Sequence, residues 1–489
     1  MRKRTINYQL AQTVLLAGGL YLTSTFSHAG IVEATQAVEK KDFKTAQIEF
    51  ESAADIGNAE AQFNLGVMHF QGQLGQVDKI ESMAWFFLAS EYQYPNARRF
   101  AEEIYGSLEK SEQAKAITYT EQKIAEIGAQ ALTKRLYPVI TQSKAEKQVI
   151  TQSAKMLVQG ELYYDPGSFA RANNNSAIQR LHRNPSLINN LSKVLVNDDS
   201  GMVQIQYDVA VDGRVREPEV VFSWPKARFN SASIESLLNS TFKPAFSAQK
   251  PVTQYGLVQN FYFGVNGVVS LRESYPNLYK AFKKLQNAAD ENVSSKYLYA
   301  CFLRGYKRLL SESEYESFEP ILLELAEQGV NVAQFDYAQY QIYEKNDLEA
   351  GLPWLIKAAK HGYADAEYKL GDLAMQPTSA YLKQDYQKAE YWLSKAAKQS
   401  HRLAQHKWVE LKVLKKNVNK TFATQALTWF SELDDDARTP KTYYLMAQMH
   451  LTLDDQSKAK KYLSQAVQIG QDYHWNVADW KKLQAQLNG

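Results

Sequence analysis

Apolar and small residues recur along most of the chain at the three- and four-residue spacing of an amphipathic helix. The pattern is plainest in GYADAEYKLGDLA, residues 362–374, and in DYQKAEYWLSKAAKQS, residues 385–400. The first segment places small residues and an aromatic side chain on one helical face, and the second does the same around a tryptophan. The chain is therefore predicted to be largely a stack of helical hairpins. Related segments lie at residues 57–66, 329–338 and 400–409.

The second helix of each predicted hairpin starts from an aspartate that lies seven residues before a large aromatic anchor. An aspartate in this place accepts hydrogen bonds from free backbone N–H groups of the first turn and meets the positive end of the helix dipole. This capping role accounts for the spacing, so these acids are interpreted as structural and not catalytic. The pairs are Asp78 and Trp85, Asp347 and Trp354, Asp385 and Trp392, and Asp455 and Tyr462.

Successive aromatic anchors have the spacing of a two-helix repeat. Trp354, Trp392, Trp429 and Tyr462 are separated by 38, 37 and 33 residues. Repeats of this length stack into a solenoid in which each unit contacts its neighbours. The 30 tyrosines and eight tryptophans would also suit stacking on carbohydrate or peptidoglycan. Most of them occupy anchor positions, however, so packing between helices is the preferred interpretation.

The pattern A-x-A-x-x-x-L-G, followed by D-x-x-K-A-x-x-W-L-x-K-A-A-x-x-G, resembles Sel1-like repeats, which are relatives of the tetratricopeptide repeat. The resemblance is strong over residues 57–90 and 329–400 and weaker over 41–57 and 400–470. It implies right-handed superhelical stacks that serve as adaptor surfaces for protein partners, with the solenoid groove holding a helix or an extended segment. Three departures together predict a distorted third-last unit: Ser400 replaces the usual glycine, His401 to Val409 lacks Leu-Gly, and the segment around Asp434 replaces the Lys-Ala-Ala closure.

The hydrophobic period changes from helical to alternating at Met202. Apolar side chains at every second position over residues 203–211 predict a β-strand, and Asp212-Gly213 is a hairpin turn signal. Val215 begins a second run of strand-forming residues that continues through Phe222. This segment is therefore predicted to be a β-hairpin.

A helix and a third strand are predicted after the hairpin. Residues Phe229 to Phe242 carry apolar side chains at helical spacing, and Pro244 would end this helix. Tyr255 to Phe263 has the composition of a strand. The expected order of elements is β-β-α-β.

The strings VQIQYDVAVDGRV, PEVVFSWP and FNSASIESLLNSTFKPAF resemble, in order and spacing, the C-terminal domain of TonB energy transducers. Thr241 departs from that family, in which an arginine often precedes the phenylalanine. The resemblance implies a small α+β domain that meets outer-membrane receptors by pairing a strand. Strand pairing needs only the backbone N–H and C=O groups of an exposed sheet edge.

The third strand is the candidate edge to which a partner would add. Its partner-binding candidates are Tyr255, Leu257, Gln259, Phe261 and Phe263. An internal or self-paired strand remains an equal alternative, because the sequence does not show which edge of a sheet is free.

The N-terminal residues have the features of a secretory signal peptide. Arg2, Lys3 and Arg4 precede an apolar stretch from Leu10 to Leu22, and Ala29 is the expected last residue removed. The expected location is the periplasm. The alternative is an uncleaved anchor that holds the chain in the inner membrane, facing the periplasm, as an accessory in TonB-type, energy-coupled outer-membrane transport.

Composition narrows the classes of function. Without residues 1–29 the chain has 53 basic and 53 acidic residues, so no overall charge directs it to nucleic acid. Cys301 is the only cysteine, which excludes an internal disulfide and a cysteine-based metal cluster. His401 and His406 lack metal-ligand spacing, and no nucleophile or phosphate-binding motif is present. We expect no enzyme activity, catalytic residue, metal or cofactor.

The predicted organisation is mostly α, with two-helix Sel1/TPR-like solenoid blocks flanking a small α+β domain like the TonB C-terminal domain. Residues 92–155 are helical by pattern, and the polar segment around Asn173 is interpreted as a linker. Such a chain is expected to bind protein partners in the cell envelope. The boundaries are 1–29 for the signal peptide, 30–100 for the first repeats, 101–195 for a helical extension and linker, 196–268 for the α+β domain and 269–489 for the remaining repeats.

Overall fold

The computed structural model describes residues 31–140, 153–158, 200–264, 271–377, 382–433 and 439–488. These residues form two compact units, of which the first contains residues 31–137 and 356–363 and the second contains the rest. The predicted signal peptide, the apolar stretch within it and the predicted linker around Asn173 lie outside the described residues. In the part of the chain described here, no helix is both long and apolar enough to cross a membrane.

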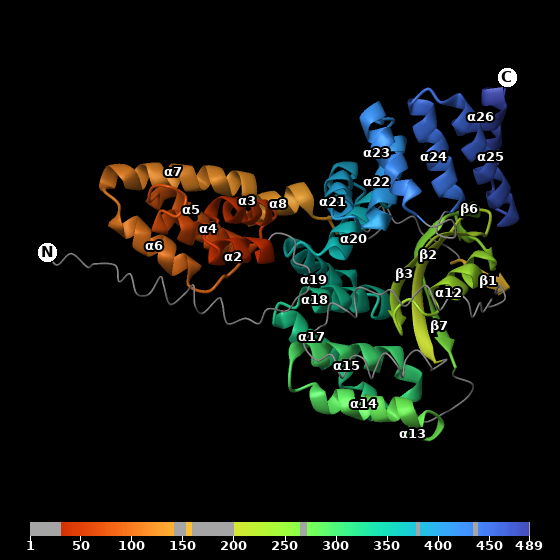
Figure 1. Cartoon of the computed structure of the whole chain (residues 1–489), viewed down its shortest axis with the longest axis horizontal. Coiled ribbons are helices and arrows are strands. Elements are labelled where there is room, and N and C mark those ends of the chain that lie inside the picture. Colours follow the sequence, from red (N-terminus) through yellow and green to blue (C-terminus); the bar gives the residue numbers. More distant parts are fainter. Residues whose placement is uncertain are drawn as a thin grey trace. The chain divides into compact units, whose positions relative to one another are not determined.

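The first unit is built from helices that pack in sequence order (Figure 1). The helices α2 and α3 pack on each other, as do α4 and α5, and both α6 and α7 pack on α5. Their bounds are α2 Ile31–Glu39, α3 Phe43–Ala54, α4 Ala59–Gln71, α5 Lys79–Glu91, α6 Ala97–Ser107, α7 Lys110–Ile127 and α8 Ala129–Leu136.

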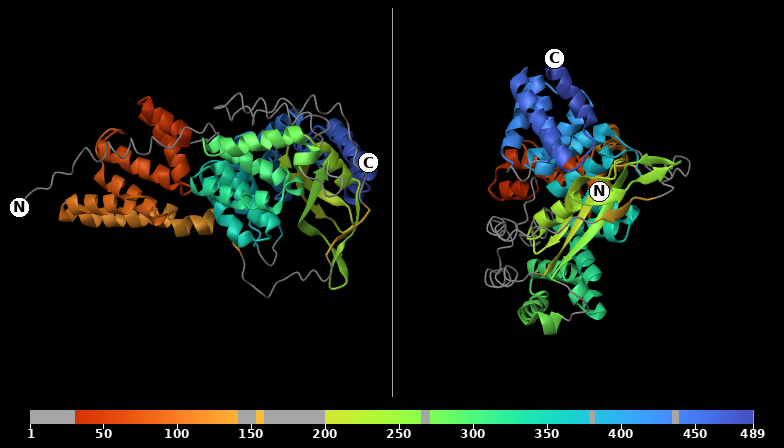
Figure 2. Two further views of the ribbon diagram at one scale, coloured as in Figure 1. Left: turned by 90° about the horizontal axis from the view of Figure 1, so that it is seen from below. Right: turned by 90° about the vertical axis from the view of Figure 1, so that its right-hand side faces the viewer.

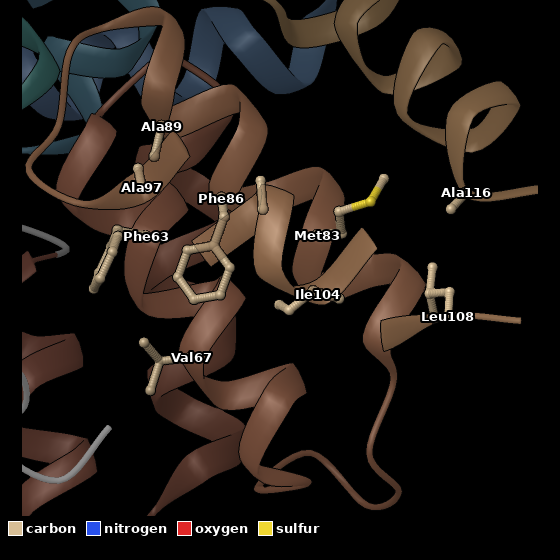
Figure 3. Close-up of a cluster of buried hydrophobic side chains, with 10 residues drawn as sticks. Phe63, Val67, Met83, Phe86, Ala89, Ala97, Ile104, Leu108 and Ala116 are labelled. Carbon is tan, nitrogen blue, oxygen red and sulfur yellow. The ribbon is translucent and has the colours of Figure 1, made fainter. Parts of the chain in front are cut away.

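Figure 3 shows the core of the first unit, where side chains of α4, α5 and α6 meet. The rings of Phe63 and Phe86 lie 4.9 Å apart in an edge-to-face arrangement, which aromatic pairs prefer. Gly66 permits this approach, because a Cβ atom there would lie 2.9 Å from the Phe86 ring. The small residue of the repeat pattern is thus needed for helix packing.

The long strands of the second unit lie side by side in Figure 2 and form an antiparallel sheet of order β3-β2-β7. The predicted hairpin is confirmed: Ala210 N–H donates to Arg214 across the turn, and Gly213 takes a φ of 74°. The elements are β1 Lys155–Val158, β2 Gly201–Val209, β3 Val215–Trp224, α12 Asn230–Leu238, β4 Thr241–Lys243, β5 Ala245–Ser247, β6 Lys250–Val252 and β7 Gln254–Phe263.

The predicted helix over residues 229–242 is too long by one turn. It ends at Leu238, and Phe242 lies in β4, where its N–H donates to the Gly213 carbonyl and its backbone pairs with Met156 of β1. These two partners from elsewhere in the chain hold Phe242 extended. The predicted order of strand, strand, helix and strand holds for β2, β3, α12 and β7, with β4, β5 and β6 added before β7.

Two smaller expectations are also wrong. Lys155 does not belong to a helix, because it pairs with Lys243 in the β1-β4 ladder. Val211 is not on the buried face of β2: the strand ends at Val209, and Val211 is 49% exposed in the hairpin turn. Both residues have local patterns that fit the prediction, but long-range pairing and the turn decide their structure.

The helix α12 covers one face of the sheet (Figure 1). Val203, Ile205 and Tyr207 of β2 form a core with Leu237 of α12 and Phe261 of β7. Because side chains alternate between the two faces of a strand, Gln204 and Gln206 point to the opposite face. That face is buried as well, since Gln204 is 0% and Gln206 is 6% exposed.

The helices after the sheet continue the repeat pattern to the end of the chain. Neighbouring helices pack in pairs, for example α20 on α21 and α24 on α25. The bounds are α13 Leu271–Ser274, α14 Pro276–Ala288, α15 Val293–Gly305, η2 Lys307–Leu309, α16 Glu312–Tyr315, α17 Phe318–Glu327, α18 Asn331–Gln339, η3 Tyr340–Glu344, α19 Leu348–Lys360, α20 Ala364–Met375, α21 Tyr386–Lys398, α22 Arg402–Leu414, α23 Lys420–Ser431, α24 Pro440–Thr452, α25 Gln456–Asp472 and α26 Ala478–Asn488.

Ser400 takes the backbone conformation that a glycine would take in the repeat pattern. Its φ is 63°, in the left-handed region, and the next residue, His401, caps α22 by accepting from the Ala404 N–H. The helices α22 and α23 then form without interruption. The change from glycine to serine therefore leaves these helices intact.

Candidate interaction surface

The repeat helices of the second unit contact the face of the sheet opposite α12, which carries Gln204 and Gln206. Arg304 of α15 is 2% exposed and donates from Nη2 to Gln204 Oε1 at 3.1 Å. Its Nε pairs with Glu344 at 2.8 Å, and its guanidinium lies 4.1 Å from the centre of the Phe222 ring. One repeat arginine thus contacts both β2 and β3, with its charge balanced by a carboxylate.

Gln206 is the second contact between the sheet and the repeats. Its Oε1 accepts from the Tyr343 hydroxyl at 2.6 Å and from Lys369 Nζ at 2.5 Å. Lys369 is 1% exposed and also lies 3.3 Å from Glu219 and 3.4 Å from Asp372. Burial alone would lower the pKa of this lysine, but Glu219, Tyr343 and Asp372 together outweigh burial and raise the pKa above its usual value. Lys369 is therefore a buried, charged residue that links α20 to β2 and β3.

Glu217 forms the third contact, from a bulge in β3. Its φ of 50° and the register shift between β2 and β3 break the regular alternation of the strand. Its carboxylate pairs with Lys407 of α22 and Lys441 of α24, and Lys441 also contacts Glu410 at 2.5 Å. Although burial opposes ionisation, the lysines hold the pKa of Glu217 well below its usual range.

These contacts limit where the expected groove for a partner's helix or extended segment can lie in the second unit. In the second unit, the repeat face that carries Arg304, Lys369 and Lys407 is occupied by the chain's own sheet. The physical reason is the match between buried repeat cations and the amides and carboxylates of β2 and β3. This repeat face is therefore not open to a partner in the structure.

The predicted edge strand does lie at an edge of the sheet. Within the described residues, β7 pairs with β2 on one side and with no strand on the other. Phe261 is 4% exposed in the core, whereas Leu257 and Phe263 are half-buried against that core and Gln259 is half-buried. Tyr255 is 44% exposed. The five candidate residues therefore differ in accessibility.

Each predicted capping aspartate accepts a backbone hydrogen bond at the start of its helix. The donors are Glu81 for Asp78, Ala350 for Asp347, Gln387 and Lys388 for Asp385, and Lys458 for Asp455. Asp455 also lies 3.5 Å from His450 Nδ1 and 3.3 Å from Lys458 Nζ.

The predicted aromatic anchors vary in burial. Trp85 and Trp392 are buried, but Trp354, Trp429 and Tyr462 are only half-buried. In each of these repeats, the residue that follows the anchor along the helix is buried. These residues are Phe86, Leu355, Leu393, Phe430 and Leu463. The position after the tryptophan or tyrosine is thus the one that is buried in all five repeats.

The described residues do not contain a group of His, Cys, Asp and Glu side chains arranged to hold a metal ion. Burial raises the pKa of the Cys301 thiol to about 12 and lowers the pKa of His406 to about 4. At neutral pH Cys301 therefore stays a thiol and His406 stays uncharged. Cys301 therefore does not supply the thiolate that a cysteine nucleophile needs, and His406 does not supply a positive charge.

Comparison with known families agrees with the repeat pattern. The Sel1 repeat model matches residues 59–91, 331–363, 364–401 and 440–470. The chain contains Sel1 repeats. Sel1-repeat proteins generally act as scaffolds for protein–protein interaction and are typically not enzymes.

Two solved structures are similar to this chain. One is a protective antigen of uropathogenic Escherichia coli with an SLR fold, at 14% identity and a TM-score of 0.34, over 89% of this chain and 68% of that one. The other is a Sel1 repeat protein from Oxalobacter formigenes, at 19% identity and a TM-score of 0.30, over 40% of this chain and 83% of that one. No match was found among curated protein sequences.

Proposed function

We propose that this chain is an exported, periplasmic scaffold for protein–protein interaction, and that its α+β module binds an extended segment of a partner by adding a strand to β7. The position of β7 at the edge of the sheet carries this proposal. An edge strand of ten residues offers a long row of backbone donors and acceptors to an extended peptide. The partner is a protein of the cell envelope.

The packing of the sheet supports a preformed docking edge. One face is covered by α12 and the other by the repeats, through Arg304, Lys369 and Lys407. These contacts hold β2 and β3, while β7 pairs along β2 and packs Phe261 into the core, so the β7 backbone needs little ordering when a partner binds. The resemblance of residues 196–268 to the TonB C-terminal domain favours the same mode and makes outer-membrane receptors one class of partner.

A photo-crosslinking amino acid at Gln259 tests strand addition in the full chain. Gln259 is a polar, half-buried residue of β7, and Lys482 on the exposed surface of α26 is the control position. The expected result is an envelope protein that crosslinks from position 259 and not from position 482. Equal crosslinking from both positions would contradict a site at β7.

A backbone variant provides the second arm of this test. Leu257→Pro removes one N–H donor from β7, so it should abolish capture of the partner that crosslinks at position 259. Circular dichroism and thermal unfolding establish whether the variant folds. If the folded variant retains that partner, strand addition to β7 is wrong.

A further inference from the structure

An exposed cation lies beside the edge strand, on the face of the sheet that the repeats cover. The guanidinium of Arg308, in η2, lies 3.8 Å from the centre of the Tyr262 ring of β7. Arg308 is exposed, and Tyr262 is half-buried. This contact places a positive charge next to the last residues of the docking edge.

The charge of Arg308 is not balanced by a carboxylate of the described chain. Its neighbour Arg304 pairs with Glu344 at 2.8 Å, but no Asp or Glu among the described residues forms an ion pair with Arg308. The Tyr262 ring holds the guanidinium of Arg308 in place, and the exposed side chain remains accessible to solvent. Arginine in such a setting binds carboxylates in well-defined geometry.

The register of the sheet decides which partner side chain would reach Arg308. Tyr262 pairs with Met202, on the face that the repeats cover, whereas Phe261 pairs with Val203, on the α12 face. Residues directly opposite each other on neighbouring strands share a face. A partner residue opposite Tyr262 would therefore point toward Arg308.

The residues on either side of that position would meet an apolar surface. Phe263 stacks on Phe229 with ring centres 4.1 Å apart, and Phe261 lies in the core beneath it. Phe263 is half-buried, so part of this surface is accessible at the edge. Partner residues opposite Phe261 and Phe263 share the α12 face and would extend this apolar surface.

We propose that β7 binds an extended peptide in which an aspartate or glutamate, flanked by apolar residues, lies opposite Tyr262 and pairs with Arg308. This inference rests on the proposed strand addition and adds the chemistry of the partner. The acidic residue supplies selectivity, and the backbone pairing supplies most of the contact.

Selection of a random nine-residue peptide library on the purified full chain tests the inference. Selected peptides should carry an acid at one position between two apolar positions. Arg308→Glu should remove that preference and weaken the selected acidic peptide about threefold to tenfold, as expected for a partly exposed ion pair. Arg308→Lys should restore part of the affinity.

Lys307→Glu is the matched control. It makes the same charge change one residue away, but the Lys307 side chain lies over the Tyr315 ring at 4.7 Å and not over Tyr262. A loss of affinity equal to that of Arg308→Glu would indicate general electrostatic attraction and would overturn the specific pair.

Hydrogen exchange of β7 amides separates failure of this inference from failure of the proposed function. If selected peptides protect β7 but show no acidic preference, the Arg308 pair is wrong and strand addition stands. If they leave the β7 amides unprotected, or if no peptide binds, both are wrong. Protection together with the acidic preference supports both.

Discussion

Gly305 of α15 packs directly against the indole of Trp224 in β3. A Cβ atom at residue 305 would lie 2.3 Å from Trp224 Cδ1 and 2.4 Å from its Cβ and Cγ atoms. No real side chain is accommodated at such a distance without a shift of the ring or the helix. The repeats and the sheet are therefore in contact where α15 ends, and that contact depends on a residue without a side chain.

Gly305→Ala should weaken the packing of the sheet on the repeats. We expect a loss of about 1–3 kcal/mol in the free energy of unfolding of the second unit, because the added methyl group overpacks the contact with Trp224. Urea denaturation followed by tryptophan fluorescence measures this loss. Gly106→Ala is the control, since a Cβ at residue 106 meets no atom within 4 Å. That control should be neutral or stabilising by up to about 1 kcal/mol.

Glu217→Gln should destabilise the same contact by a different route. The amide cannot balance Lys407 and Lys441, which would leave two half-buried lysines with only Glu410 and Asp372 nearby. Removing one member of a buried pair costs about 3–5 kcal/mol, and because Glu217 is 22% exposed we expect about 1–3 kcal/mol.

The matched control for Glu217→Gln is Asp454→Asn. Asp454 and its partner Lys420 are 78% and 69% exposed, so loss of their ion pair should cost less than about 1 kcal/mol. Chemical denaturation in low and high salt compares the two variants. Similar, small losses for both would mean that Glu217 does not tie the sheet to the repeats.

Elements with a local signal could be predicted from the sequence, and those set by distant partners could not. The aspartate caps and the Asp212-Gly213 turn depend on residues within one turn of chain. Phe242 instead becomes a strand because Met156, far away in the sequence, pairs with it. The helical spacing of residues 229–242 does not indicate that Met156 pairs with Phe242.

The contacts of the sheet with the repeats were missed for a related reason. Gln204 and Gln206 alternate with apolar residues, a pattern typical of a strand with one solvent-facing side, yet both are buried. One signal was present: at positions 202, 204 and 206 this face has no charged residue. Lys369 likewise stands inside a repeat helix, and only the fold places Gln206 and Glu219 beside it.

Export of the chain predicts a defined N-terminus. If the sequence up to Ala29 is a signal peptide, the mature protein should begin at Gly30 and occur in the periplasmic fraction. N-terminal sequencing of the protein from that fraction makes the measurement, with Ala29→Lys as a variant that should block cleavage. An N-terminus at Met1 in the membrane fraction would instead support the anchored transport accessory.

Glu367 of α20 should make stability fall as pH rises. The side chain is 0% exposed; Gln399 donates to it at 2.6 Å, and Lys395 lies 3.7 Å away. Burial raises its pKa to about 7, because these two partners only partly offset the loss of water. In the unfolded chain the same carboxyl group ionises near pH 4.5.

Between these two values the folded chain keeps a proton that the unfolded chain has released. Ionisation of Glu367 therefore lowers the stability of the fold progressively from about pH 4.5 to pH 7. Glu367→Gln cannot ionise and keeps an oxygen to accept from Gln399. Its free energy of unfolding, relative to the natural chain, should be higher at pH 8 than at pH 5 in urea denaturation. The same difference at both pH values would show that ionisation of Glu367 is not linked to folding.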